Sequence, residues 1–350
     1  MGDIIMSGPA IRALKETFNC TITLLTSTMG GIISPCLLHV DETLVYNLPW
    51  IKAADSLQAG ACLELIDRLK QECFDAAVIF TAYSQSALPA AMLCFLAGIP
   101  RRLAYCRENP YELLTHWAPD KEPYSKILHQ VERDLDLVRA VGADVADDRL
   151  ALKVSYDAFR TAASKPEGID LYQPFIIAHA GVSEKKREYP LDDWIKTVRG
   201  LYDQFQIPIL LTGSRLEKPQ AESIQRAAGH GVFSAAGLFT IEEFVAVVSE
   251  ARLVVSVNTA TVHIAAATGT PVIVLYAQTN PQHTPWKVYS RVLYFPVQEE
   301  LRSKNEVINF VSNQLYSNPV PIPAPADVIK AAARVLKTGM VKAGSRNIIQ

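Results

Sequence analysis

The chain has 350 residues, of which 49% are hydrophobic and 20% are charged, a balance typical of a soluble globular protein. This length favours two domains, each large enough for its own core. A net charge of −2 gives no overall basic field, so we do not expect a nucleic-acid partner. The six cysteines form no C-x-x-C pair, which favours reduced cytosolic thiols over a zinc site or a disulfide framework.

The start of the sequence does not resemble a secretory signal, because Met1 is followed by Gly2 and Asp3 rather than by basic residues. The longest apolar run, at 86–100, contains Pro89 and is too short to span a bilayer. We therefore expect a buried helix at this run and a cytoplasmic protein.

Strand-like segments alternate with helical patterns through the first half of the chain, which is typical of a parallel α/β sheet. A segment at 108–126 is rich in proline, tyrosine and charge, and it is expected to form a long loop. The predicted strands are 21–27, 43–48 and 74–81, and the predicted helices are 8–18, 60–72, 86–97 and 127–141.

A second α/β series follows a stretch dense in proline, glycine and charge, which we interpret as a linker. The series ends with two apolar strands joined by a polar step and a short helix at 254–281, and with a helix at 325–337. Its earlier strands are 175–179, 207–212 and 232–235, and its earlier helices are 191–205, 217–228 and 240–250. The expected domains are 1–164 and 175–337, with a linker at 165–174, a tail at 338–350 and a cleft at the domain interface.

Polar loops follow three of the predicted strands in this second series. They are "HAGVSEKKREYP" at 179–190, "GSRLEKP" at 213–219 and "NTAT" at 258–261. Carboxyl ends of parallel strands meet at one edge of a sheet, so these loops should share a rim. A basic cluster, the carboxylate of Glu217 and a helix start suit a nucleotide diphosphate.

Two interpretations of the step at 258–261 stay open. Asn258 or Thr259 could serve only as a helix cap. A phosphate site also explains His263 and the small residues after it, which let a ligand approach the backbone, and we favour this interpretation. For the basic run at 185–187, a solvated charged surface is the alternative.

Common catalytic motifs are absent from the sequence, including G-x-G-x-x-G, Walker A, G-x-S-x-G and H-E-x-x-H. Asp134 and Asp136 form a D-x-D pair of the kind that binds metal in many sugar transferases. The pair lies in an amphipathic helical pattern, so we expect a solvated helix face there. The histidines show no metal-ligand spacing, and no metal site is expected.

Three motifs in chain order resemble the ADP-heptose:lipopolysaccharide heptosyltransferase family. They are "GDIIMSGPAIRALK" near the start, "HAG" with "KREYPLDDW" in the middle, and "SVNTATVHIAAATGTPVIVLY" near the end. The resemblance implies an α/β fold of two facing Rossmann-like domains, the B-type glycosyltransferase fold. It also implies inverting, metal-independent transfer of heptose or a similar sugar, without a separate cofactor. The donor would be an ADP-linked nucleotide sugar, and the acceptor a lipid-linked lipopolysaccharide-core or related glycan at the inner face of the cytoplasmic membrane.

The resemblance also assigns site residues by position. Asp3 matches the catalytic aspartate, and Glu217 matches a glutamate that contacts the ribose. Arg187, with Lys186 beside it, falls where the family has a phosphate-binding lysine. The diphosphate element corresponds to Asn258, Thr259, Ala260 and His263, with Asn in place of Asp at 258 and Ala in place of Gly at 260. These departures and the change to Arg187 leave the donor and acceptor open.

Alternatives to this assignment remain at the level of the sequence. A nucleotide-sugar epimerase of the same fold and a catalytically silent nucleotide-sugar-binding protein are the rival functions. Asp3 could be only the N-cap of the helix that begins near Ile5. In the amino half, Arg101, Arg102 and Arg107 are weaker candidates for contacts with acceptor phosphates.

Resembling proteins have an apolar strand directly before the Gly-Asp pair, and that strand lies in the middle of a doubly wound sheet. Here the pair is Gly2 and Asp3, so the first strand of the amino-terminal domain is expected to be absent. A mis-assigned start or a truncated form is the explanation that we favour.

Overall fold

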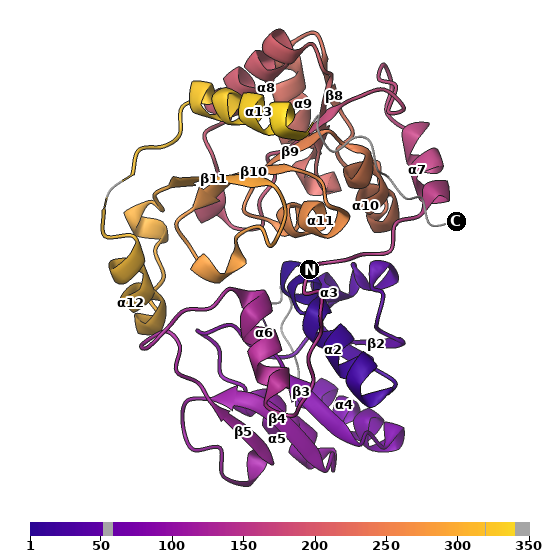
Figure 1. The fold of residues 1–350 in the computed structure, drawn as a ribbon, viewed down its shortest axis with the longest axis vertical. Coiled ribbons are helices and arrows are strands. Elements are labelled where there is room, and N and C mark those ends of the chain that lie inside the picture. Colours follow the sequence, from indigo (N-terminus) through magenta and orange to yellow (C-terminus); the bar gives the residue numbers. More distant parts are fainter. Residues whose placement is uncertain (52–58, 319, 340–350) are drawn as a thin grey trace. The chain divides into compact units, whose positions relative to one another are not determined.

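The computed structural model describes residues 1–51, 59–318 and 320–339 (Figure 1). The chain divides into two compact units, of which unit 1 comprises Asp3–Asp148 and unit 2 starts at Arg149. This division comes before the predicted linker at 165–174, because helix α7 (Tyr156–Ala163) packs on helix α10 (Ile241–Glu250) of unit 2. Residues 149–164 thus lie with unit 2, while the predicted domain limits stay a prediction.

Unit 2 contains a six-stranded parallel sheet with the order β8-β7-β6-β9-β10-β11. The strands are β6 (Ile176–His179), β7 (Ile209–Thr212), β8 (Val232–Ser234), β9 (Leu253–Val257), β10 (Val272–Ala277) and β11 (Ser290–Phe295). This is the order of a doubly wound nucleotide-binding fold, in which the direction of winding reverses between the first and fourth strands. Here the reversal falls between β6 and β9, so a ligand is expected beyond their carboxyl ends.

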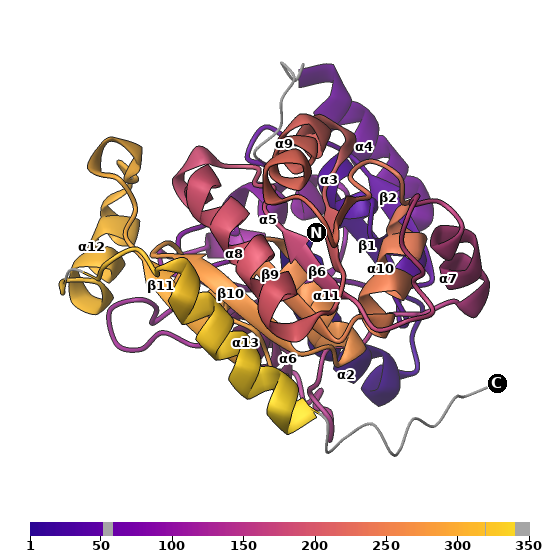
Figure 2. The same cartoon turned by 90° about the horizontal axis from the view of Figure 1, so that it is seen from above.

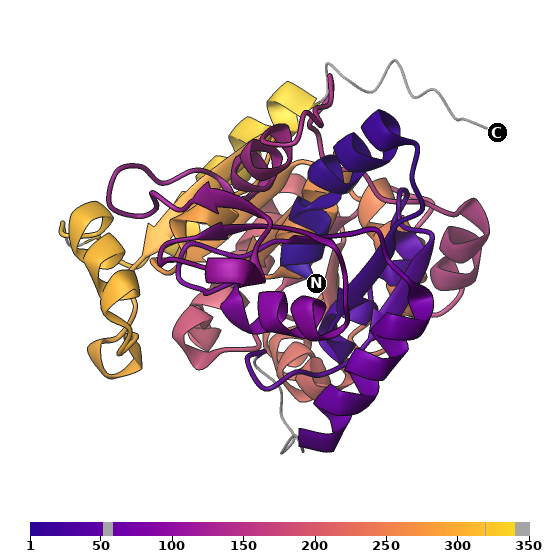
Figure 3. The same cartoon turned by 90° about the horizontal axis from the view of Figure 1, so that it is seen from below.

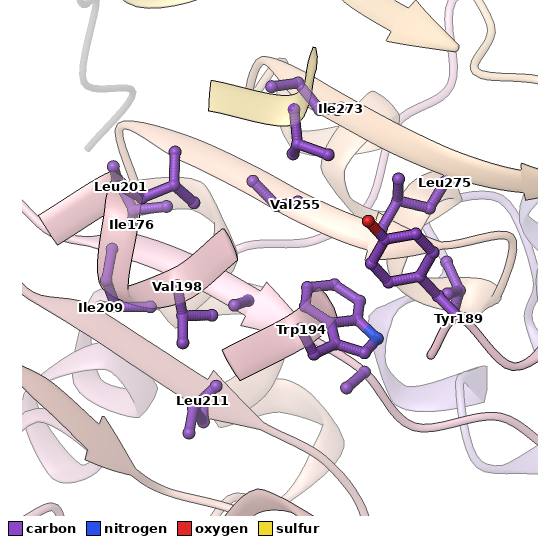
Figure 4. Close-up of a cluster of buried hydrophobic side chains, with 14 of the residues drawn as sticks. Ile176, Tyr189, Trp194, Val198, Leu201, Ile209, Leu211, Val255, Ile273 and Leu275 are labelled. Carbon is purple, nitrogen blue, oxygen red and sulfur yellow. The ribbon is translucent and has the colours of Figure 1, made fainter. Parts of the chain in front are cut away.

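Helices cover both faces of this sheet (Figures 1 and 2). Helix α8 (Leu191–Phe205) packs with α9 (Lys218–Ala228) and α13 (Pro325–Gly339) on one face, and α10 packs with α7 and α11 (Ala260–Thr268) on the other. The core under α8 centres on Trp194, which is fully buried and lies edge-on to Tyr189 at 5.7 Å (Figure 4). The Tyr189 hydroxyl donates to the Pro323 carbonyl at 2.6 Å, so the loop after β6 is anchored beside the core.

Unit 1 contains two parallel sheets, β1-β2 and β3-β4-β5 (Figure 3). Within the described ranges no strand pairs with both β1 and β3, and the predicted loss of a first strand stays a prediction. The strands are β1 (Thr23–Thr26), β2 (Glu42–Val45), β3 (Ala76–Ile79), β4 (Arg101–Cys106) and β5 (His116–Pro119). The helices are α1 (Gly2–Met6), α2 (Gly8–Phe18), α3 (Thr28–Gly31), α4 (Ala59–Glu72), α5 (Leu88–Leu96) and α6 (Gln130–Arg139). None of the helices in the described ranges of either unit is long and apolar enough to cross a bilayer.

The segment at 108–126 is not a continuous loop, which corrects the sequence-based expectation. It contains a 3-10 turn, η2 (Tyr111–Leu113), and the edge strand β5. The Trp117 indole donates to the Cys106 carbonyl at 2.9 Å, which ties β5 to β4. A short edge strand in a polar segment gives too weak a pattern to be read from sequence.

The expected solvated face is wrong for Asp134, whereas the side chain of Asp136 is 43% exposed. Helix α6 is buried over most of its circumference, and Asp134 has 1% of its surface exposed. Its carboxylate accepts hydrogen bonds from Ser7 and Gln130, whereas Asp136 accepts one from Tyr105 at 2.6 Å. Helix α6 packs against α2 (Figures 1 and 3), so its polar residues are paired inside unit 1.

Candidate functional site

The polar loops after the strands of unit 2 share one edge of the sheet, as predicted. In the parallel register His179, the last residue of β6, lies opposite Thr212 on β7 and Ser256 on β9. The three strands therefore end at nearly the same level. The loops that follow β6 and β9 flank the point where the winding of the sheet reverses.

Arg187 reaches from the loop after β6 to the loop after β9. It ends a 3-10 turn, η3 (Lys185–Arg187), and its Nη1 donates to the Asn258 carbonyl at 3.1 Å. Its Nη2 lies 3.0 Å from a carboxylate oxygen of Glu184. The Arg187 Nε is buried without a hydrogen-bond partner among the described residues. A guanidinium with one unused donor thus lies beside the start of α11.

The same acidic residue contacts the second basic side chain of this turn. Lys186 Nζ lies 3.5 Å from the Glu184 carboxylate, and its side chain is 30% exposed. Lys185 is exposed to solvent. Of the basic run at 185–187, Arg187 is therefore the residue that the fold directs towards α11, and the solvated interpretation fits Lys185.

The step at 258–261 is held in a way that leaves the start of α11 without a side-chain cap. Thr259 occupies the N-cap position, but its hydroxyl makes no capping bond and lies 3.4 Å from the Ser256 hydroxyl. Asn258 accepts from the Ala277 backbone at 3.2 Å and donates to Thr279 at 3.0 Å. Asn258 is therefore not a cap, because its amide ties the ends of β9 and β10 together. Backbone N–H groups at this helix start remain suited to an anion.

His263 lies one turn into α11, which starts at Ala260. Its side chain is 5% exposed, and its ring lies edge-on to that of His283, with centroids 6.3 Å apart. His283 closes a 3-10 turn, η5 (Pro281–His283), in the loop after β10. The step, His263 and the loop after β10 therefore belong to one packed cluster at the carboxyl edge of the sheet.

Glu217 belongs to the loop after β7, at the end of a 3-10 turn, η4 (Arg215–Glu217). One of its carboxylate oxygens accepts from the Ser214 backbone at 2.6 Å. The side chain passes over Gly181, where an added Cβ would lie 2.2 Å from the Glu217 Cδ. The glycine after β6 thus makes room for the carboxylate. Sequence analysis missed this role, although a glycine just after a buried strand is a signal of close approach.

His179 is a further polar residue at this edge that sequence analysis did not single out. Its Nδ1 is 3.0 Å from the Thr212 hydroxyl, and the residue is half-buried at the end of β6. Burial lowers the pKa of His179, and the nearby charge of Glu217 opposes that shift only in part. The surroundings of this imidazole therefore favour its neutral form. Its signal in the sequence is a histidine at the carboxyl end of the strand next to the reversal point.

Asp3 belongs to unit 1, whereas the other predicted site residues belong to unit 2. It is exposed in the first turn of α1, and its carbonyl accepts from the Ser7 backbone at 2.9 Å. The N-cap of α1 is Met1, so the alternative interpretation of Asp3 as a helix N-cap is wrong.

The arginines considered for the acceptor differ in their surroundings. Arg102 is 7% exposed and donates to the carbonyls of Leu113 and Glu112 at 2.8 and 2.9 Å. Arg107 donates to the carbonyl of Tyr83 at 2.7 Å and makes further contacts within its own unit. The prediction is therefore wrong for Arg102, whose guanidinium holds the turn before β5. Arg101 is exposed.

Comparison with known proteins identifies the chain. Residues 62–309 match the sequence profile of glycosyltransferase family 9 (heptosyltransferase). The chain belongs to this family. It is therefore a glycosyltransferase with the α/β fold predicted from its motifs, and the resemblance to the heptosyltransferases is confirmed.

Individual relatives agree with this assignment. The chain is 24% identical over 303 residues to lipooligosaccharide heptosyltransferase 2 of Haemophilus influenzae, covering 81% of this chain and 83% of the relative. A family 9 glycosyltransferase from Veillonella parvula has a similar fold, with a TM-score of 0.76 at 14% identity, over 97% and 95% of the two chains. The E. coli ADP-heptose lipopolysaccharide heptosyltransferase II has a TM-score of 0.71 at 19% identity, over 97% and 96%.

Proposed function

We propose that this glycosyltransferase moves a heptose, or a closely related sugar, from an ADP-linked donor to a lipopolysaccharide-core acceptor. The names of two relatives support the substrates, one as a lipooligosaccharide heptosyltransferase and one as an ADP-heptose enzyme. The acceptor is lipid-linked, so the enzyme acts at the inner face of the cytoplasmic membrane and binds there peripherally. No separate cofactor takes part in this proposal.

The contact between Arg187 and the Asn258 carbonyl, at 3.1 Å, carries the proposal. It brings a guanidinium to an uncapped helix start, beside the reversal point of a doubly wound sheet. A charge-assisted hydrogen bond from Arg187 to a diphosphate is worth about 1.5–3 kcal/mol. The start of α11 adds roughly 0.3–1 kcal/mol. Arg187 therefore supplies the larger part of diphosphate binding, with Lys186 as a second positive charge.

The remaining donor contacts follow from the same edge of the sheet. The backbone at Thr259 and Ala260 faces the diphosphate, and His263 donates to it from the next turn of α11. Glu217 accepts hydrogen bonds from the ribose hydroxyls, because its side chain is directed across Gly181 at the end of β6. These groups replace the charge compensation that a metal ion supplies in other sugar transferases.

Transfer proceeds by a single displacement at the anomeric carbon. Asp3 takes the proton from the acceptor hydroxyl, whose oxygen forms a bond to the anomeric carbon as the bond to the diphosphate breaks. The configuration of the sugar is inverted, and ADP leaves with the electron pair of the broken bond. Negative charge grows on the leaving diphosphate, so Arg187 and the helix start stabilise the transition state more than the bound donor.

Replacement of Asp3 by asparagine tests this function. Sugar transfer from ADP-heptose to heptose-deficient lipopolysaccharide should fall by about 10²–10⁴-fold, while ADP affinity stays within a factor of two or so of the parent. Transfer within a few-fold of the parent contradicts the role of Asp3. A parent protein that binds ADP-heptose without transferring the sugar is a silent binder, and one that alters the free donor without an acceptor is an epimerase.

A further inference from the structure

The turn that joins α1 to α2 contains a serine in an unusual role. Ser7 occupies the N-cap position of α2, where a serine side chain ordinarily bonds to the helix backbone. Here no side-chain bond caps α2, and the backbone at Ser7 is already helical, with φ −74° and ψ −9°. The hydroxyl is therefore available for another partner.

That partner is the carboxylate of Asp134 on α6. The Ser7 Oγ donates to an oxygen of Asp134 at 2.6 Å, and the same hydroxyl lies 3.1 Å from the Asp3 carbonyl. Both side chains are enclosed, since Ser7 is 7% exposed and Asp134 is 1% exposed. The backbone N–H of Ser7 bonds to the Asp3 carbonyl and its hydroxyl bonds to Asp134, so Ser7 ties the turn of α1 to a buried carboxyl on a helix far away in sequence.

Burying a carboxylate costs folding free energy unless the group is paired and hydrogen-bonded. Asp134 receives a second hydrogen bond from Gln130 at 2.8 Å. The neighbouring Arg133 guanidinium is occupied by Asp120, Glu122 and the Thr81 carbonyl instead. Apolar side chains would fill this position at lower cost, so the hydrogen bond to Ser7 is the feature that distinguishes this polar pair.

Helix α1 needs support from outside because it is short. A helix of five residues is not stable on its own in water. Pro9 has no backbone N–H, so it cannot continue the hydrogen-bond ladder from the Ile5 carbonyl into α2. The contacts of Ser7 therefore add to the buried side chains of Ile5 and Met6 in holding the turn with Asp3.

We propose that Ser7 and Asp134 are positioning residues for Asp3, with Asp134 holding the Ser7 hydroxyl and thereby fixing the turn of α1 that carries the catalytic carboxylate. This inference rests on the proposed function of Asp3 as the base. The position of a base matters because it must lie within hydrogen-bonding distance of the acceptor hydroxyl to take its proton. Loss of the link should lower kcat and leave donor binding unchanged, because the donor groups belong to unit 2.

Two readouts test the link, one of position and one of catalysis. Deuterium uptake of an N-terminal peptide covering residues 1–11 should be roughly ten- to hundred-fold faster in Ser7→Ala than in the parent, as expected for loss of a hydrogen bond to a charged group. Asp134→Asn keeps an amide that can bond to the Ser7 hydroxyl, so its uptake should lie between the two. The matched control is Asp136→Asn, two residues along the same helix and bonded to Tyr105, which should leave uptake unchanged.

For catalysis, Ser7→Ala should lower kcat by about tenfold or more with KM for the donor unchanged. The same change made in Asp3→Asn should cause no further loss, because the residue that it positions is no longer a base. An unchanged uptake in Ser7→Ala overturns the inference, as does a full additional loss in the double variant. Fast uptake combined with an active Asp3→Asn enzyme overturns the proposed base instead, and with it the catalytic part of the positioning role.

Discussion

Asp134 on α6 carries a predictable dependence of stability on pH. Burial raises the pKa of its carboxyl to about 7, although Ser7, Gln130 and Arg133 favour the ionised form; Asp3 adds to the rise. Because its folded-state pKa lies above that of the unfolded chain, the contribution of Asp134 to stability is largest in acid. That contribution is lost as the pH rises to about 7. Asp134→Asn should remove this loss, so its unfolding free energy should gain on the parent by up to about 1.4 kcal/mol per pH unit. Denaturant unfolding from pH 4 to 8 measures the difference.

Asp136, two residues further along α6, should behave in the opposite way. Partial burial would raise the pKa of Asp136, but hydrogen bonds from Tyr105 and Lys126 lower it below its usual value. Its ionised form stabilises the fold at neutral pH, and that contribution is lost as pH falls through the folded-state pKa. Asp136→Asn should thus be less stable than the parent at pH 7 and equal to it in acid. The same pH trend in both variants would contradict these assignments.

Arg187 offers a test of the diphosphate site by comparison of two ligands. Arg187→Ala should weaken ADP binding by about 1.5–3 kcal/mol and leave adenosine binding nearly unchanged, because adenosine has no charged group for the guanidinium. Lys185→Ala is the matched control, since this residue is exposed in the same 3-10 turn. Calorimetric titration measures both ligands. Equal losses for ADP and adenosine would remove Arg187 from the diphosphate site.

Among the elements, the strands of unit 2 that are buried on both faces were predictable from sequence, as was the edge strand β8, whereas β4 of unit 1 and β11 were not. β9 and β10 are continuous buried apolar runs, and the pattern "VVSV…VIVLY" predicts both strands. Among the described residues β11 pairs with β10 alone and is mostly half-buried or exposed, and β4 begins with two arginines, so neither gave a clear signal. Pairing with a neighbour far away in sequence decides such strands, and a single sequence does not show it.

The loop after β6 and the turn before α9 meet at Gly181 and Glu217, which makes their contact testable. In Gly181→Ala the new methyl group would collide with the Glu217 Cδ, so the carboxylate must move away from the carboxyl end of β6. ADP affinity should fall about as far as it does in Glu217→Ala. The double variant should bind no worse than Glu217→Ala alone, because the collision no longer exists. Additive losses in a calorimetric double-mutant cycle would refute this contact.

On the scale of the whole molecule, sequence analysis identified the fold class and the rim of unit 2, and it failed where residues far apart in sequence pair with each other. The loops after β6, β7 and β9 could be located because parallel strands end at the same edge. The burial of α6 could not be foreseen, since an amphipathic pattern does not reveal that Asp134 faces Ser7. The prediction that Arg102 contacts acceptor phosphates failed because the sequence does not show that its partners are carbonyls of a neighbouring turn.

The polarity of the sheet in unit 2 leads to a prediction for the whole chain. Nucleotide binding at the carboxyl ends of the strands should slow hydrogen exchange in the loops at 180–190, 213–218 and 258–263. ADP at about a hundred times its Kd should also stabilise the folded protein by roughly 2.7 kcal/mol through mass action. In Arg187→Ala, the same ADP concentration should give a smaller rise in Tm.

Hydrogen exchange with mass spectrometry, in the presence and absence of ADP, locates the protected segments. Connections at the opposite edge, such as 206–208 and 229–231, provide an internal control because they enter β7 and β8 at their amino ends. Their exchange should change only by the general stabilisation, whereas the three loops should be protected beyond it. Protection concentrated at the amino ends would place the nucleotide on the wrong side of the sheet for Arg187 and α11. The diphosphate site proposed for those residues would then have to be abandoned.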